Sequence, residues 1–228
     1  MDTRVISSKG AHTQIVVETQ GLVFTPDNLM SVLRNNDFQI VQGNVSNPLN
    51  PSFPPQNTQI YSKDSLMIFL LQTQPLNSLI FTIMNSFNLK EEKVGGKSAI
   101  EMIKNIMESL SLVDETISAI TFHFTTRFGA TKKPTEQLTK LLNKEFTSKI
   151  KKIPSLSSLK MLSIRLGDVF PIEKEGINIV FEPFLSNPEK MFFIQFTKKV
   201  VDRDSLFELI DRFPKILEEL INGVDSSD

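Results

Sequence analysis

The stretch ISAITFHFTTRFGATKKP, residues 117–134, alternates apolar and polar side chains almost without a fault. One side carries Phe122, Phe124 and Phe128, and the other carries His123, Thr125 and Arg127. Because successive side chains of a strand point to opposite faces of its sheet, this alternation predicts a strand over residues 117–128. We expect the phenylalanine side to face the core and the polar side to face away from it.

Strand and helix patterns continue from this stretch in both directions along the chain. Before it, we predict strands over residues 14–24, 38–42, 58–62, 65–74 and 78–87, and helices over 26–36 and 97–111. After it, we predict a helix over 134–151, strands over 159–166, 176–182 and 190–199, and a helix over 204–222. Thr25 is the expected N-cap of the first helix, and Asp204 or Ser205 that of the last.

Several predicted strands follow one another directly, which is typical of antiparallel sheets. The sequence therefore predicts an α+β fold, with a largely antiparallel sheet and about four helices packed mainly on one face. The 228 residues form one expected domain, with a possible sub-domain boundary near residues 88–97, where charged residues and glycine cluster. Both sides of that boundary would hold a sheet with helices, so either one continuous domain or two similar lobes would fit.

The composition removes several classes of chemistry. The chain has no cysteine, which excludes disulfides, thiolate metal sites and cysteine nucleophiles, and its only histidines are His12 and His123. The net charge of −1 indicates no global field for a nucleic acid or a membrane. The longest apolar run is residues 66–71, and the first residues lack the apolar region of a signal peptide. We therefore expect a cytoplasmic protein with no metal, no cofactor and no membrane partner.

The segment GGKS, residues 95–98, looks like the end of a phosphate-binding loop and precedes a predicted helix. The full motif needs a glycine five residues before Gly96, where this chain has Glu91, whose carboxylate would repel phosphate. We interpret the segment as a connector in which Ser98 caps the helix. No serine lies in a G-x-S-x-G elbow, and we assign no catalytic residue.

The predicted helix 134–151 and the residues before it carry the clearest charge pattern. The candidate binding residues are Arg127, Lys132, Lys133, Lys140, Lys144 and Lys151. Residues 129–153 hold seven lysines against two glutamates, whereas residues 202–228 hold eight acidic side chains against three basic ones. A one-sided basic stripe could follow a phosphate backbone, remain a solvated helix face, or meet the acidic C-terminal segment within the molecule or across a dimer.

These patterns leave three functional hypotheses. The first is a non-enzymatic interaction protein that acts through surface contacts, associating with a second copy as a dimer or with another protein. The second is a nucleic-acid-binding accessory protein that uses the basic helix 133–151. The third is a small apolar-ligand-binding protein or an enzyme with a pocket near His123 and Arg127.

Overall fold

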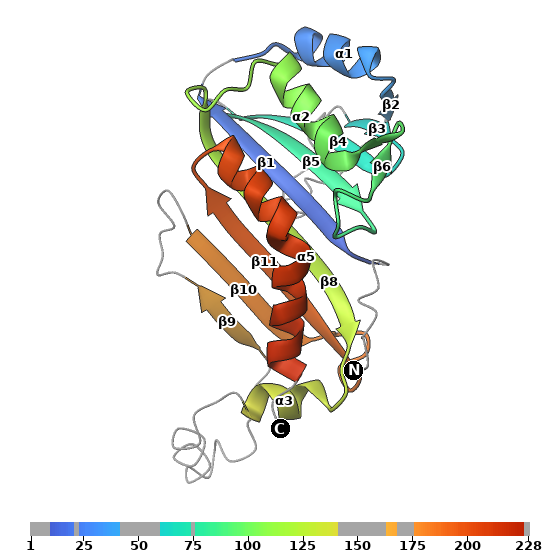
Figure 1. Cartoon of the computed structure of the whole chain (residues 1–228), viewed down its shortest axis with the longest axis vertical. Coiled ribbons are helices and arrows are strands. Elements are labelled where there is room, and N and C mark those ends of the chain that lie inside the picture. Colours follow the sequence, from blue (N-terminus) through green and yellow to red (C-terminus); the bar gives the residue numbers. More distant parts are fainter. Residues whose placement is uncertain are drawn as a thin grey trace.

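A computed structural model describes residues 10–20, 23–41, 60–73, 76–140, 163–167 and 176–225. Its main feature is a nine-stranded sheet with the order β2-β3-β4-β5-β1-β8-β11-β10-β9 (Figure 1). The strands are β1 (His12–Gln20), β2 (Gln39–Val41), β3 (Ile60–Lys63), β4 (Leu66–Thr73), β5 (Leu76–Met84), β8 (Ile117–Gly129), β9 (Ile164–Gly167), β10 (Gly176–Pro183) and β11 (Met191–Val200). A separate small hairpin pairs β6 (Lys93–Val94) with β7 (Lys97–Ser98).

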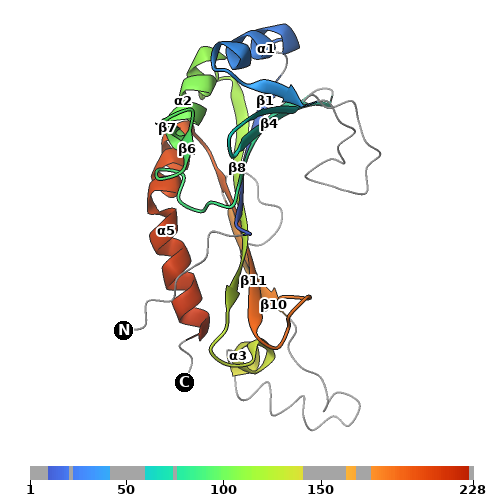
Figure 2. The same cartoon turned by 90° about the vertical axis from the view of Figure 1, so that its right-hand side faces the viewer.

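All pairs of neighbouring strands in the large sheet are antiparallel. The described helices are α1 (Pro26–Asn35), α2 (Ala99–Ser109), α3 (Pro134–Lys140) and α5 (Arg203–Asp225). Figure 2 shows α2 and α5 on one side of the sheet, with α1 and α3 at its two ends. The α+β prediction, with a large antiparallel sheet and helices mainly on one face, is confirmed.

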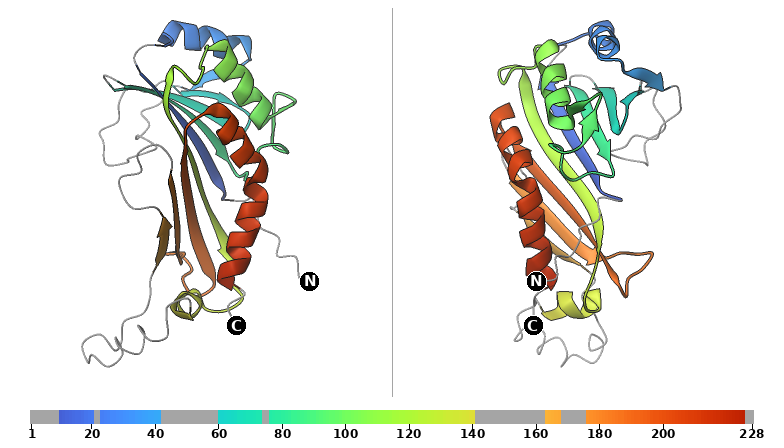
Figure 3. Two further views of the ribbon diagram at one scale, coloured as in Figure 1. Left: turned by 60° about the vertical axis from the view of Figure 1, so that its left-hand side comes forward. Right: turned by 45° about the vertical axis from the view of Figure 1, so that its right-hand side comes forward.

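The two halves of the chain share one pattern of connections around the central strands β1 and β8. Among the described elements, β1 is followed by α1 and then by four strands of the sheet, β2-β3-β4-β5, while β8 is followed by α3 and then by three, β9-β10-β11. In the first half, β5 lies beside β1 and is followed by the β6–β7 hairpin and α2. In the second half, β11 lies beside β8 and is followed by α5. The two halves thus form similar lobes that share one sheet (Figure 3).

Aromatic packing fixes the long helix α5 on the sheet. The ring centroid of Phe213 lies 4.8 Å from that of Phe122, 4.8 Å from that of Phe124 and 5.1 Å from that of Phe196. Phe122, Phe124 and Phe128 are all buried, as their alternation predicts. Edge-to-face aromatic contacts of this kind add to the energy of apolar burial. Strand β8 therefore supplies part of the surface on which α5 packs.

Helix starts follow the local sequence in two cases and differ in a third. The Thr25 side chain accepts a hydrogen bond from the Asn28 N–H, and Ser98 with Glu101 forms a complete capping box at α2, so both predicted caps are confirmed. For α5 the prediction of Asp204 or Ser205 is wrong. The Asp202 carboxylate accepts a hydrogen bond of 2.6 Å from the Ser205 N–H, so the helix begins earlier. This bond lowers the pKa of Asp202.

The main core continues from one lobe into the other. The segment near residues 88–97 contains the β6–β7 hairpin, and its Leu89 and Val94 are buried in this core.

None of the helices in the described part of the chain combines the length and the apolar character that crossing a membrane requires.

Candidate functional site

The candidate site lies on the face of the large sheet opposite α2 and α5, which we call the open face. Because side chains alternate along each strand, the neighbours of the buried phenylalanines on β8 belong to this face. The open face carries His12, Gln14, Val16 and Glu18 on β1, and Thr121, His123, Thr125 and Arg127 on β8. The polar row of β8 that the sequence predicted therefore lies at the centre of the open face, beside the side chains of β1.

The open face differs in character between the two lobes. In the first lobe it carries a small buried apolar cluster, made of Val16, Ile60, Phe69, Leu71 and Ile80. In the second lobe, Arg127 is exposed and five other polar side chains are partly exposed. These are Thr121, His123, Thr125, Gln195 and Thr197. The polar accessible part of the open face thus lies over β8, β11 and β10, whereas Val41 and Met84 are exposed apolar side chains on the same face of the first lobe.

A row of uncharged polar side chains crosses the middle of the open face. The register places Thr82, Gln14, His123, Thr197 and Asn178 side by side on five successive strands. Gln14 Nε2 donates to Thr82 Oγ1 at 3.3 Å, and His123 Nδ1 lies 3.0 Å from Thr197 Oγ1. These bonds align the row, because each partner restricts the rotamers of its neighbour.

Both histidines of the chain lie on this face, on neighbouring strands. His12 faces Thr125 across the β1–β8 pair, and His123, two residues before Thr125, lies on the diagonal from His12. Diagonal neighbours in an antiparallel pair are within reach of long or aromatic side chains. Burial lowers the pKa of both imidazoles, so both are uncharged at neutral pH.

Arg127 lies at the far end of the β8 row. Its guanidinium carbon is 5.2 Å from the centroid of the Phe184 ring, a cation–π distance. On the neighbouring strands Phe193 and then Glu182 continue its row. Gly10, with a φ of 87°, lets this side chain pass close to the backbone, since a Cβ there would lie 3.2 Å from Arg127 Nε.

The structure describes only part of the predicted basic stripe. Lys132 is exposed, and Lys133 forms an ion pair with Glu189 that raises the pKa of Lys133. The side chain of Lys140, together with Lys144 and Lys151, lies outside the described residues. Helix α3 contacts the acidic helix α5 of the same chain. At the β10–β11 turn, residues 184–190, the fold brings Arg127 and Lys133 to the same end of the sheet.

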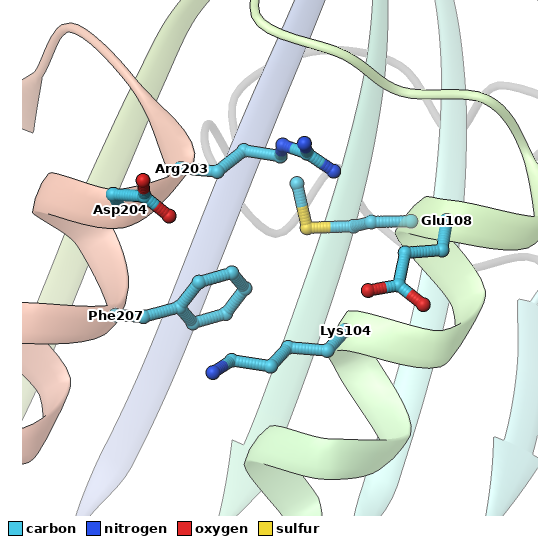
Figure 4. A pocket seen from close by; sticks show the side chains of 6 residues that line it. Lys104, Glu108, Arg203, Asp204 and Phe207 are labelled. Atoms are coloured by element: carbon cyan, nitrogen blue, oxygen red, sulfur yellow. The ribbon is translucent and has the colours of Figure 1, made fainter.

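A second candidate site is a small cavity of about 130 Å³ between α2 and α5 (Figure 4). Lys104 Nζ lies 4.3 Å from the centroid of the Phe207 ring, and Met107, Glu108, Arg203 and Asp204 complete the lining. Two cations and two carboxylates therefore share the cavity, so it offers no net charge to a ligand. No sequence pattern pointed to it, because its two walls come from helices in different halves of the chain.

Arg203, which lines this cavity, also contacts Asp114 in the loop after α2. Its backbone N–H donates to Asp114 Oδ1 at 3.0 Å, and its Nε lies 3.6 Å from the same oxygen. The longer distance allows charge attraction but is beyond a hydrogen bond, and among the described residues the buried Nε has no hydrogen-bond partner. Arg203 thus fastens the loop after α2 to the start of α5.

A larger groove of about 320 Å³ lies between β11 and α5, lined in part by Lys198, Glu208 and Arg212. Neither this groove nor the smaller cavity includes His123 or Arg127, so the pocket expected near those two residues stays a prediction. Across the described ranges, no group of three or more histidine and acidic side chains could hold a metal ion. Comparisons of the chain with protein-family models, with curated proteins and with solved structures find no match.

Proposed function

We propose that the protein is a non-enzymatic binding protein and that the open face of its second lobe contacts a protein partner. The observation that carries the proposal is a broad, partly exposed sheet face over β8, β11 and β10 that no helix of the described chain covers (Figure 2). Its described side chains supply hydrogen-bond donors and acceptors, and neither the cavity between α2 and α5 nor the groove between β11 and α5 includes them. Surface contact is the function such a face can perform.

The charges on this face favour a protein over a nucleic acid. The described charged residues on it have both signs: Arg127, Arg165 and Lys199 against Glu18 and Glu182. Binding to a phosphate backbone depends on a uniformly basic surface, whereas protein interfaces combine arginine and aromatic residues with a mixed polar rim. The row of Arg127, Phe193 and Glu182 has this mixed character.

The partner is either a second copy of the chain or another protein. Helix α3 contacts the acidic helix α5 within one molecule, so this part of α5 is not open to α3 of a second copy. Self-association is therefore expected to use the open face. Sedimentation equilibrium over a range of concentrations measures it directly, and a mass that stays monomeric leaves another protein as the partner.

A pair of charged, bulky substitutions on the open face tests the proposal. Thr125 and Gln195 face each other on β8 and β11, so Thr125→Glu with Gln195→Glu places two longer, negatively charged side chains in the middle of the face. The matched control is Ser109→Glu with Asn222→Glu, which adds the same charges at exposed positions of α2 and α5. Each protein is immobilised, incubated with an extract of the cells that produce it, and the captured proteins are quantified.

The proposal predicts that wild type and control capture the same protein, and that the face variant loses it. The captured protein is then purified and titrated against all three forms, and the affinity of the face variant should fall about a hundredfold, as when interface hot spots are removed. Equal capture by the face variant and the control would show that the open face is not the binding surface.

A further inference from the structure

We infer that the open face recognises an acidic protein surface and binds it more tightly as the pH falls, through His12 and His123 together with Arg127. This inference rests on the proposed function, because it names the chemistry of the partner for the same face. It begins from the position of the histidines: the chain has only two, from opposite halves of the sequence, and the fold places them on adjacent strands.

The register defines which groups surround the two imidazoles. His12 is opposite Thr125, so its diagonal neighbours on β8 are His123 and Arg127. His123 is opposite Thr197 of β11, so Gln195 and Lys199 lie on its diagonals there. Diagonal positions are roughly 7–8 Å apart, close enough for charges to interact across the sheet. The nearest ionisable neighbours of both histidines are therefore basic.

Carboxylates lie farther from the histidines on every strand of this face that packs against them. On β5, the residues opposite His12 and Gln14 are Met84 and Thr82, which carry no charge. Glu18 lies four residues beyond Gln14 on β1, about 13 Å along the strand. Glu182 of β10 is separated from Arg127 by Phe193, and Arg165 of β9 is basic. The described part of the molecule thus places no carboxylate beside either imidazole.

Protonation of the two histidines would change the charge of this surface. At neutral pH the charged side chains next to the two histidines are Arg127 and Lys199, because burial keeps both imidazoles neutral by lowering their pKa. In acid two further positive charges appear beside them, and the described carboxylates of the same face, Glu18 and Glu182, lie farther away. A partner that brings carboxylates to this surface relieves the repulsion and raises both histidine pKa values. By linkage, the same partner binds more tightly when the histidines are protonated.

The patch formed by His12, His123 and Arg127 suits an acidic protein surface better than a nucleic acid. It is short, and Glu182 and Glu18 border it, so a long phosphate backbone leaving the patch would meet negative charge. A few carboxylates on a folded partner or an acidic peptide can lie over the histidines and Arg127 without approaching Glu18 or Glu182. Charge complementarity of this local kind sets the specificity of protein interfaces.

A labelled deca-aspartate peptide is a suitable probe, because aspartate stays ionised over the range in which histidine titrates. Fluorescence anisotropy measures its affinity from about pH 7.5 to about pH 5.5 at constant ionic strength. The proteins compared are wild type, His12→Gln with His123→Gln, each single histidine variant, and Arg127→Gln. Lys104→Gln on α2 removes a charge from the opposite side of the sheet and serves as the control. Circular dichroism at both ends of the range confirms that each variant is folded.

Wild type and the Lys104→Gln control should bind the peptide about tenfold more tightly at the acidic end, the effect of one added charge pair. In the double histidine variant the ratio of the acidic to the neutral affinity should fall to about one, in the single variants it should fall in part, and Arg127→Gln should bind weakly throughout. An increase that survives in the double variant overturns the inference.

Binding that depends on Arg127 but not on pH overturns the inference and leaves the proposed function standing. Absence of peptide binding, beside a captured partner that is lost in the Thr125→Glu/Gln195→Glu variant, refutes the acidic chemistry alone. Preference for a 20-base-pair DNA duplex over the peptide refutes the protein partner, and with it the proposed function.

Discussion

The Nδ1 atom of His123 lies 3.0 Å from the Oγ1 atom of Thr197, directly across the β8–β11 pair. Both side chains are partly buried, so removing the hydroxyl would leave a ring nitrogen without that partner. We expect Thr197→Val to lower the free energy of unfolding by about 1 kcal/mol in urea denaturation. Valine keeps the shape and the strand preference of threonine, so the loss reports the hydrogen bond.

Thr125→Val is the control for this measurement, since Thr125 lies on the same face and its side chain makes no hydrogen bond within the described residues. It should change the free energy of unfolding by less than about 0.5 kcal/mol. Equal losses in the two variants would mean that the contact between His123 and Thr197 contributes nothing measurable.

The stability of the protein should fall as the pH drops below about 6.5, the pKa of an unperturbed histidine. Burial lowers the pKa of His12 and of His123 in the folded state, so below this pH the unfolded chain binds more protons than the folded one. The free energy of unfolding then decreases with falling pH. Thermal denaturation between about pH 7.5 and about pH 5.5 measures this slope above the range in which carboxylates titrate.

The His12→Gln/His123→Gln variant should show a flatter dependence of the melting temperature on pH over the same range. Its melting temperature at the neutral end is not the test, because the substitution also changes packing. A slope equal to that of wild type would show that the two histidines do not carry the linkage.

Patterns within a single element predicted most of the fold. The alternation in β8 identified its buried phenylalanines. The unbroken apolar run of β4 is typical either of a strand covered on both faces or of one that the alternation rule does not resolve. In the structure Leu66, Ile68 and Leu70 lie in the main core, while Phe69 and Leu71 lie in the cluster on the open face. Each of these predictions depends on side chains a few residues apart, which a periodic pattern records.

Relationships between distant strands could not be predicted in the same way. His123 and Arg127 were singled out from β8 alone, but the position of His12 beside them depends on the register between β1 and β8. Similarly, the pairing of Lys133 with Glu189 depends on how the β10–β11 turn reaches the start of α3. A register joins residues from separate parts of the sequence, and no local spacing encodes it. The start of α5 was misplaced because several acidic or hydroxyl residues there can all act as caps.

Ser98 tests whether the segment GGKS acts as a helix cap. Its hydroxyl accepts a hydrogen bond from the Glu101 N–H, and the Glu101 carboxylate accepts one from the Ser98 N–H, which lowers the pKa of Glu101. Ser98→Ala should lower the free energy of unfolding by about 1 kcal/mol, and Ser98→Asp, which keeps a capping oxygen, should recover most of it. Addition of ATP with magnesium should leave the melting temperature unchanged; a clear upward shift in wild type that Ser98→Ala abolishes would instead indicate a phosphate site.

Phe213 should be the largest single contributor to the attachment of α5. Its ring packs on three phenylalanines from β8 and β11 and has no exposed surface, so truncation leaves a cavity that rigid strands cannot close. We expect Phe213→Ala to cost about 3–5 kcal/mol in urea denaturation. Leu185→Ala, at a side chain that is 90% exposed in the β10–β11 turn, should change stability by less than about 0.5 kcal/mol.

If Phe213→Ala does not fold, Phe213→Leu gives the same comparison with a smaller cavity and a smaller loss. Loss of near-ultraviolet signal is not informative here, because the chain has one tyrosine and no tryptophan. Hydrogen exchange is more direct: amides of α5 should exchange faster in the Phe213 variants, while those of β4 and β5 keep their protection relative to global unfolding. Uniform acceleration across both lobes would show that the helix and the whole sheet unfold as one unit, and that Phe213 stabilises all of it.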